Sequence, residues 1–218
     1  VWRMRHVLLT GFDPFGGERV NPALEAVRCL DGRVIAGAVV RAVEVPTVRF
    51  KCVERVRSAI AELDPLLVIS VGQAGGRAEI TPERVAINVD DFRIKDNEGN
   101  QPVDEVVDPK GPAAYFSTLP IKAMVDAMRR AHIPASVSNT AGTFVCNHLF
   151  YGLMRHLHLE GNVRRGGFVH IPYLPEQAAR LSGQPSMGLD CVLTGLEAGI
   201  AAALECGEDK PITGGTEC

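Results

Sequence analysis

The sequence predicts an α/β domain in which helices cover both faces of a mostly parallel sheet. The first observation is an alternation: short apolar runs of the strand type are followed, again and again, by longer runs with helical spacing. The second is that the strand-type runs are apolar enough to be buried on both faces. The third is size: 218 residues with 46% hydrophobic side chains fit one domain, 1–218, with a substantial core.

The first strand and the first helix are joined by a glycine-rich turn. Residues 6–10 are apolar and predict a buried strand, and the turn follows at 11–17. Asn21 and Pro22 then open a helix that runs to residue 30, because asparagine caps a helix start and proline fits its first turn.

Three strands and one helix are expected next. Residues 34–45 predict a strand, and 48–63 a helix with Val53, Val56, Ile60 and Leu63 on one face. Residues 66–71 are an apolar strand that ends at Gly72, and 85–89 alternate as a further strand.

The second half continues the alternation. A helix is marked by apolar residues at 121, 124, 125 and 128, and a strand is expected at 135–138. The next helix begins at Cys146, a strand follows at 167–171, and a last helix spans the apolar positions from 189 to 203.

Two segments lack such patterns. Residues 92–118 are long, polar and proline-containing, and we expect a functional or mobile loop there. Residues 207–218 are expected to form a frayed tail, and Met4 is a candidate for the natural first residue.

Composition excludes several classes of function. With a net charge of −3, the chain has no excess of positive charge that would indicate binding to nucleic acid or to an anionic membrane. No apolar run approaches the ~18 residues that span a bilayer. The six cysteines show no C-x-x-C pair, which argues against a disulfide framework and against zinc. We expect a protein of the reducing cytoplasm.

Cys146 is the candidate nucleophile. It follows a turn of small residues and stands in the first turn of a helix, where free N–H groups and the helix dipole favour an anion. Such a position lowers the pKa of a thiol, so we expect a thiolate.

His170 is the preferred base among six histidines. It ends the strand after the Cys146 helix, and the ends of parallel strands meet at one edge of the sheet. His148 lies only two residues from Cys146 on the same helix, so the two side chains diverge.

The acid that would orient the base remains open at this point. Glu79 and Glu83 both follow the strand 66–71 and its glycine-rich loop, and spacing does not separate them. Phe12 and Phe15, in the turn at 11–17, are expected as apolar walls of a pocket at the same edge, or as a plug for a gap in the core. That turn lacks the spacing of a nucleotide-binding loop.

Five motifs together resemble the pyrrolidone-carboxylate peptidase (pyroglutamyl peptidase I) family. They are residues 9–17 (LTGFDPFGG), 72–77 (GQAGGR), 97–102 (NEGNQP), 138–148 (SNTAGTFVCNH) and 170–175 (HIPYLP). The resemblance extends from about residue 7 to residue 203 and leaves the C-terminal tail out.

The resemblance implies a cytosolic cysteine peptidase with an α/β/α sandwich fold and no metal or cofactor. Members remove an N-terminal pyroglutamyl residue from peptides, and tetramers are common among them. Matching positions give the catalytic residues as Cys146, His170 and Glu83. The implied substrate-binding residues are Phe12, Phe15, Gln73 and Arg93.

Two other functions are weighed against this one. A Cys–His–Glu amidase of the glutaminase type would need a charged partner for the substrate amine. A non-catalytic small-molecule-binding domain would leave Cys146 as a merely buried cysteine.

Overall fold

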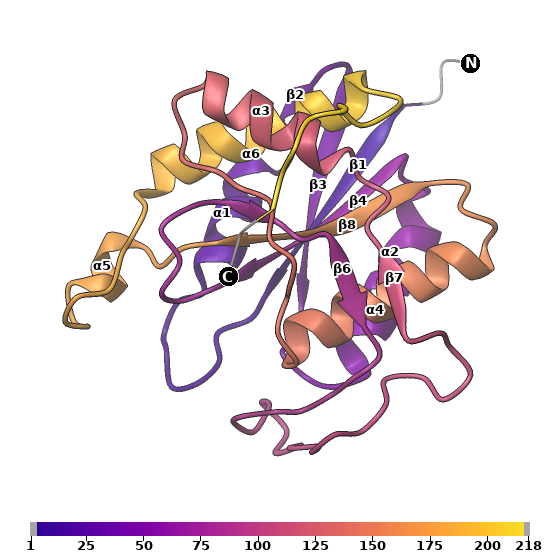
Figure 1. Cartoon of the computed structure of the whole chain (residues 1–218), viewed down its shortest axis with the longest axis vertical. Helices are drawn as coiled ribbons and strands as arrows, with labels where there is room; N and C mark the ends of the chain where they lie inside the picture. Colours follow the sequence, from indigo (N-terminus) through magenta and orange to yellow (C-terminus); the bar gives the residue numbers. More distant parts are fainter. Residues whose placement is uncertain (1–3, 216–218) are drawn as a thin grey trace.

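A six-stranded sheet between two layers of helices forms the centre of the protein, in the computed structural model that describes residues 4–215 (Figure 1). Its strand order is β2-β3-β1-β4-β8-β5, and β3, β1, β4 and β8 run parallel. The strands are β1 (His6–Phe12), β2 (Val34–Ile35), β3 (Ala38–Val45), β4 (Leu67–Gln73), β5 (Thr81–Pro82) and β8 (Arg165–Ile171). The predicted fold class is confirmed. The expectation that Met4 is the natural first residue concerns residues 1–3, which lie outside the described residues.

Figure 1 shows α1, α3 and α6 on one side of the sheet and α2 and α4 on the other. The helices are α1 (Pro22–Leu30), α2 (Lys51–Leu63), α3 (Ile121–Arg130), α4 (Val145–Leu159), α5 (Pro175–Ala178) and α6 (Leu189–Glu205). Each layer buries its own apolar cluster against the sheet, with Leu24, Met124 and Leu196 on one side and Ile60, Phe150 and Leu153 on the other. The sheet is therefore covered on both faces, as its apolar strands require.

Alternation along the strands decides which side chains meet α4. In β8, Phe168 belongs to the cluster under α2 and α4, while Val169 and Ile171 belong to the opposite cluster. His170 lies two residues from Phe168 and therefore faces the α4 side. Gly72 of β4 is the register partner of His170, so these two residues stand side by side at the carboxyl edge of the sheet.

Two predicted strands are corrected. The run 34–45 is a hairpin and not one strand, because Ala36 and Gly37 both take positive φ and reverse the chain, so β2 pairs antiparallel with β3. Residues 135–138 make only isolated bridges, Ile80 to Ala135 and Glu83 to Ser138. The helix predicted from residue 48 begins at Lys51, since Phe50 has a φ of 65°.

The segment 85–118 adds a small second sheet. Strands β6 (Val85–Ile87) and β7 (Ala114–Phe116) pair antiparallel and lie outside the main sheet. The loop between them is tied by backbone hydrogen bonds, for example from the Phe92 N–H to the Pro102 carbonyl. The expected long loop is thus present, and its last part is strand.

The tail is docked as far as the structure describes it, where the sequence suggested fraying. Residues 207–215 carry no helix or strand, but the Asp209 carboxylate accepts hydrogen bonds from the N–H groups of Lys122 and Ala123. These groups open α3, which has no side-chain cap of its own at Pro120. The Gly214 carbonyl accepts a hydrogen bond from Arg84, and Figure 1 shows the tail (yellow) running from α6 past α3.

Candidate active site

A cavity of about 560 Å³ opens at the carboxyl edge of the parallel strands. It is lined by the ends of β4 and β8, by the turn after β1 and by the loop that leads into α4. Cys146 and His170 both lie on its wall. The structure thus brings together the two residues that the sequence predicted as nucleophile and base.

Cys146 is the second residue of α4 and packs on the sheet edge. Phe144 is the N-cap residue of this helix, so the Cys146 N–H has no acceptor within the helix ladder. A methyl group added to Gly72 would lie 2.9 Å from the Cys146 Sγ atom. Because Gly72 has no side chain, the Cys146 thiol fits next to it. Gly72 is also the register partner of His170.

His170 is held by Glu83. The His170 Nδ1 atom lies 2.7 Å from the Glu83 Oε1 atom, and both side chains are buried, at 4% and 0% exposure. Glu83 is fixed by its backbone, since its N–H donates to the Phe168 carbonyl of β8. Glu79 is half-buried on the same connection. Of the two acids that spacing left open, Glu83 is the one that contacts His170.

Arg77 is a site residue that the sequence analysis did not assign. Its guanidinium donates to the Glu83 Oε1 atom at 2.6 Å and to the Thr140 carbonyl at 2.8 Å. Its position in the loop after β4, six residues before Glu83, was the only available signal. Spacing does not show that its side chain turns back toward the acid.

The expectation of a resting thiolate is wrong. Burial, followed by the Glu83 charge, raises the pKa of Cys146 to about 12, although the Arg77 charge acts in the opposite direction. Burial also lowers the pKa of His170, although its hydrogen bond with Glu83 acts the other way. The helix N-terminus favours an anion, but desolvation of the thiol outweighs it, so the resting pair is a neutral thiol and a neutral imidazole.

Aromatic side chains form one wall of the cavity. Phe15 and Phe144 line it, with ring centroids 5.8 Å apart, and Phe92 packs edge-on against Phe144 at 4.9 Å. Phe12 lies deeper than expected: it is the last residue of β1, is 2% exposed and packs on Phe168. Phe144, unassigned from the sequence, takes the wall position that was expected for Phe12.

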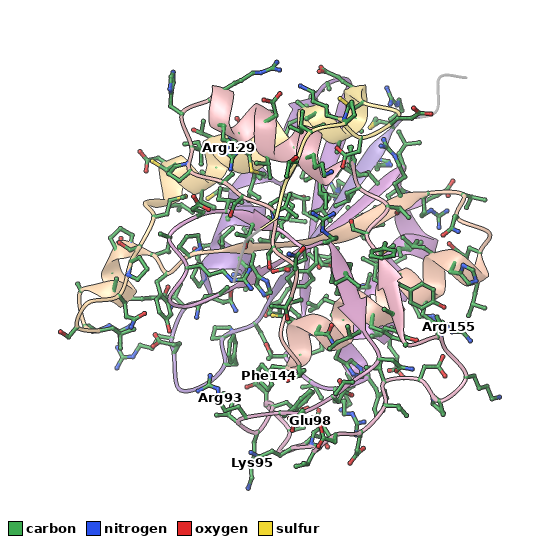
Figure 2. The ribbon with its side chains drawn as sticks, viewed as in Figure 1. Arg93, Lys95, Glu98, Arg129, Phe144 and Arg155 are labelled. Atoms are coloured by element: carbon green, nitrogen blue, oxygen red, sulfur yellow. The ribbon has the colours of Figure 1, made fainter. Side chains whose placement is uncertain are left out.

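Gln73 and Arg93, which the family resemblance implies as substrate-binding residues, both line the cavity. The buried Gln177 amide donates to the Gln73 Oε1 atom at 2.9 Å, which leaves the Gln73 amide nitrogen as a donor. The Arg93 side chain is exposed, and Figure 2 shows it near Phe144 on the cavity side of the molecule.

His148 has a structural role and not a catalytic one. Its Nδ1 atom lies 2.8 Å from the buried Asp90 carboxylate, and its Nε2 atom accepts the Phe50 N–H at 2.9 Å. Both ring nitrogens are thus engaged, and the ring anchors the turn before α2. Within residues 4–215 no group of three or more His, Cys, Asp or Glu side chains could hold a metal ion. In that same range, no helix is long and apolar enough to cross a bilayer.

Known proteins with similar sequences and structures share one description. A family model described as pyroglutamyl peptidase matches residues 5–206. The chain is 54% identical to a pyrrolidone-carboxylate peptidase of Vibrio vulnificus, over 99% of this chain and 100% of that protein. It is 55% identical to one from Bacillus cytotoxicus, over 98% and 99%.

Solved structures agree with these matches. The pyroglutamyl peptidase I from Bacillus amyloliquefaciens superposes with a TM-score of 0.94 at 50% identity, over 97% of this chain and all of that one. The pyrrolidone carboxyl peptidase from Thermococcus litoralis gives 0.92 at 34% identity, over 96% and 100%.

Proposed function

The chain belongs to the pyroglutamyl peptidase family, and from this premise we propose that it hydrolyses the amide bond after an N-terminal pyroglutamyl residue of peptides. The single observation that carries the proposal is the buried contact of Glu83 with His170, whose imidazole lines the same cavity as Cys146. An acid, an imidazole and a thiol in this order are the parts of a cysteine hydrolase.

Cys146 is the proposed nucleophile and His170 the general base. The Cys146 Sγ atom attacks the pyroglutamyl carbonyl carbon as its proton passes to the free Nε2 atom of His170. The other ring nitrogen faces Glu83, which fixes the tautomer and stabilises the imidazolium that forms. The resting thiol is neutral, so the proton transfer accompanies the attack.

The tetrahedral intermediate carries an oxyanion near the start of α4. The Cys146 N–H, free of the helix ladder, is placed to donate to it. His170 then gives its proton to the departing amine, the C–N bond breaks and a thioester remains. Water, deprotonated by His170, hydrolyses the thioester, releases pyroglutamate and restores the thiol.

The cavity suits an uncharged ring. Phe15 and Phe144 supply apolar walls, and the Gln73 amide supplies a donor for a lactam oxygen. A free α-ammonium would call for an available carboxylate. The Glu83 carboxylate is buried and already engaged by His170 and Arg77. Glu18, which lines the cavity, is paired with Arg180 at 2.8 Å. We propose that Arg93 contacts the substrate from the open side of the cavity.

The test is hydrolysis of pyroglutamyl-aminomethylcoumarin, with prolyl-aminomethylcoumarin and free glutamine as comparison substrates. Prolyl compounds keep the ring but replace the lactam by an ammonium, so they should be poor substrates. Cys146→Ala and His170→Ala should each lower kcat/KM by about 10⁴-fold or more, and Glu83→Gln by about 10³–10⁴-fold. Cys191→Ala, on α6, is the matched control and should keep full activity.

Turnover that survives in the Cys146→Ala variant would overturn the assignment of the nucleophile. A preference for glutamine over the pyroglutamyl compound would replace the peptidase by an amidase. Full activity of the Glu83→Gln variant would remove Glu83 from its orienting role.

The proposed setting is a cytoplasmic homotetramer in which 1–218 form a single peptidase domain. The cysteines in the described residues are all unpaired, which suits a reducing compartment. The oligomeric state rests on the family resemblance, and light scattering of the purified protein tests it.

A further inference from the structure

We propose that Arg77 is a positioning residue of this peptidase, which holds Glu83 against His170 and joins the acid to the loop that carries Cys146. The inference rests on the proposed function, since it assigns a role toward the same three residues. It goes beyond that function because it adds a fourth side chain to the catalytic arrangement.

The guanidinium of Arg77 reaches three partners at once. Its Nη1 atom donates to the Glu83 Oε1 atom at 2.6 Å and to the Thr81 Oγ1 atom at 2.7 Å. Its Nη2 atom donates to the Thr140 carbonyl at 2.8 Å. A guanidinium presents donors in a rigid fork, so it can serve these acceptors simultaneously, whereas an ammonium group is a single point charge.

Glu83 needs such a partner because its carboxylate is fully buried. Oε1 carries both the contact with His170 and the contact with Arg77, while Oε2 has no hydrogen-bond partner among the described residues. With His170 neutral at rest, Arg77 supplies the permanent positive charge beside this acid. A buried carboxylate without a counter-charge is strongly unfavourable.

The second arm of Arg77 fixes the nucleophile loop. The Thr140 carbonyl also accepts the Ser138 hydroxyl at 3.0 Å, and the Thr140 Oγ1 atom accepts the Gly142 N–H. Residues 140–144 line the cavity and lead directly into α4. A movement of Arg77 would therefore displace the acid and the loop before Cys146 together.

The charge of Arg77 also acts on the titration of the pair. It lowers the pKa of Cys146 against burial, and it lowers the pKa of His170. The other titratable or charged groups that line the cavity are Glu18, Arg93 and Tyr173, and the buried Glu83 contacts His170 directly. Removing the positive charge at residue 77 should therefore raise the pKa of His170, and the neutral base should then be available only at higher pH.

The experiment compares Arg77→Gln with Arg77→Lys in the full chain, using kcat, KM and the pH profile of kcat/KM on pyroglutamyl-aminomethylcoumarin. In Arg77→Gln, kcat should fall about tenfold or more, as is typical when a group that orients a functional side chain is lost, with little change in KM. Its acid limb should move to higher pH. Arg77→Lys should lose kcat as well, because the fork is lost, but it should keep the acid limb in place.

Arg155→Gln is the matched control. Arg155 on α4 also has several partners, Asp108, Tyr115 and the Lys110 carbonyl, and a partly buried side chain, but it lies far from Arg93 in Figure 2. This variant should lose stability without any change in kcat or in the acid limb. Thermal melts of all three variants separate folding from function.

Three results would overturn the inference. One is an Arg77→Gln enzyme with unchanged kcat. Another is a rise in KM at constant kcat, which would make Arg77 a substrate-binding residue. The third is an acid limb that coincides in Arg77→Gln and Arg77→Lys. If the unaltered protein fails to cleave the pyroglutamyl compound, the proposed function itself fails, and that result is separate from these three.

Discussion

Replacing Gly72 by alanine should disable the enzyme while leaving it folded. The added methyl group would lie 2.8 Å from the Phe168 Cζ atom and 2.9 Å from the Cys146 Sγ atom, whereas ordinary contacts begin at 3.4–4 Å. Phe168 is packed between Phe12 and Phe150, so its ring has little freedom to retreat. The thiol is the group that must move, by about 0.5–1 Å.

The size of the effect follows from that displacement. A misplacement of about 1 Å at a reacting atom costs about 10²-fold in rate, because the attack geometry is lost. Overpacking of this kind costs about 1–3 kcal/mol of the free energy of unfolding. We therefore expect kcat/KM to fall about 10²-fold at a modest loss of stability.

The assay pairs initial rates on pyroglutamyl-aminomethylcoumarin with a urea unfolding curve. Gly166→Ala is the matched control: its methyl group would lie 2.7 Å from the Leu157 Cδ1 atom, at the other end of β8. It should lose comparable stability and keep its rate. Equal rates for Gly72→Ala and the unaltered enzyme would refute the claim that residue 72 makes room for the thiol.

Two further predictions concern pH and the tail. Because burial lowers the pKa of His170 from its ordinary 6.5, kcat/KM should be lost only as pH falls below that value. The value of kcat/KM should then stay level through neutral pH, since the thiol with a pKa of about 12 remains protonated. A fall in kcat/KM on the alkaline side, near the ordinary thiol pKa of about 8.5, would instead indicate a thiolate–imidazolium pair. Asp209→Ala should lower stability by about 1 kcal/mol through loss of the cap on α3, with kcat unchanged. An unchanged melting temperature, compared with that of Glu208→Ala, would contradict that role for Asp209.

The positions of Cys146 and His170 could be predicted because both follow from backbone rules. A residue at a helix start and a residue at a strand end meet at one edge of a parallel sheet. The choice between Glu79 and Glu83 could not be made from spacing, since both follow β4. The choice depends on the antiparallel pairing of Thr81 with His170. Thr81 belongs to β5, a two-residue strand that has no sequence pattern of its own.

Each wrong or missing expectation has its own physical cause. The ionisation of Cys146 depends on burial by groups distant in the sequence, and a local helix start says nothing of it. Phe12 was expected in a turn, but β1 extends to it and strand alternation turns its ring into the core. Arg77 went unassigned because a long flexible side chain can reach in many directions from one backbone position.

The order of strands at the edge of the sheet links folding to chemistry. Strand β8 lies between β4 and β5, so within residues 4–215 the segment that carries Glu83 joins the main sheet through the strand that carries His170. Because β8 comes late in the chain, a nascent or partly unfolded molecule without it has an open sheet edge and no acid–base pair. Recovery of turnover during refolding should therefore report the insertion of this one strand.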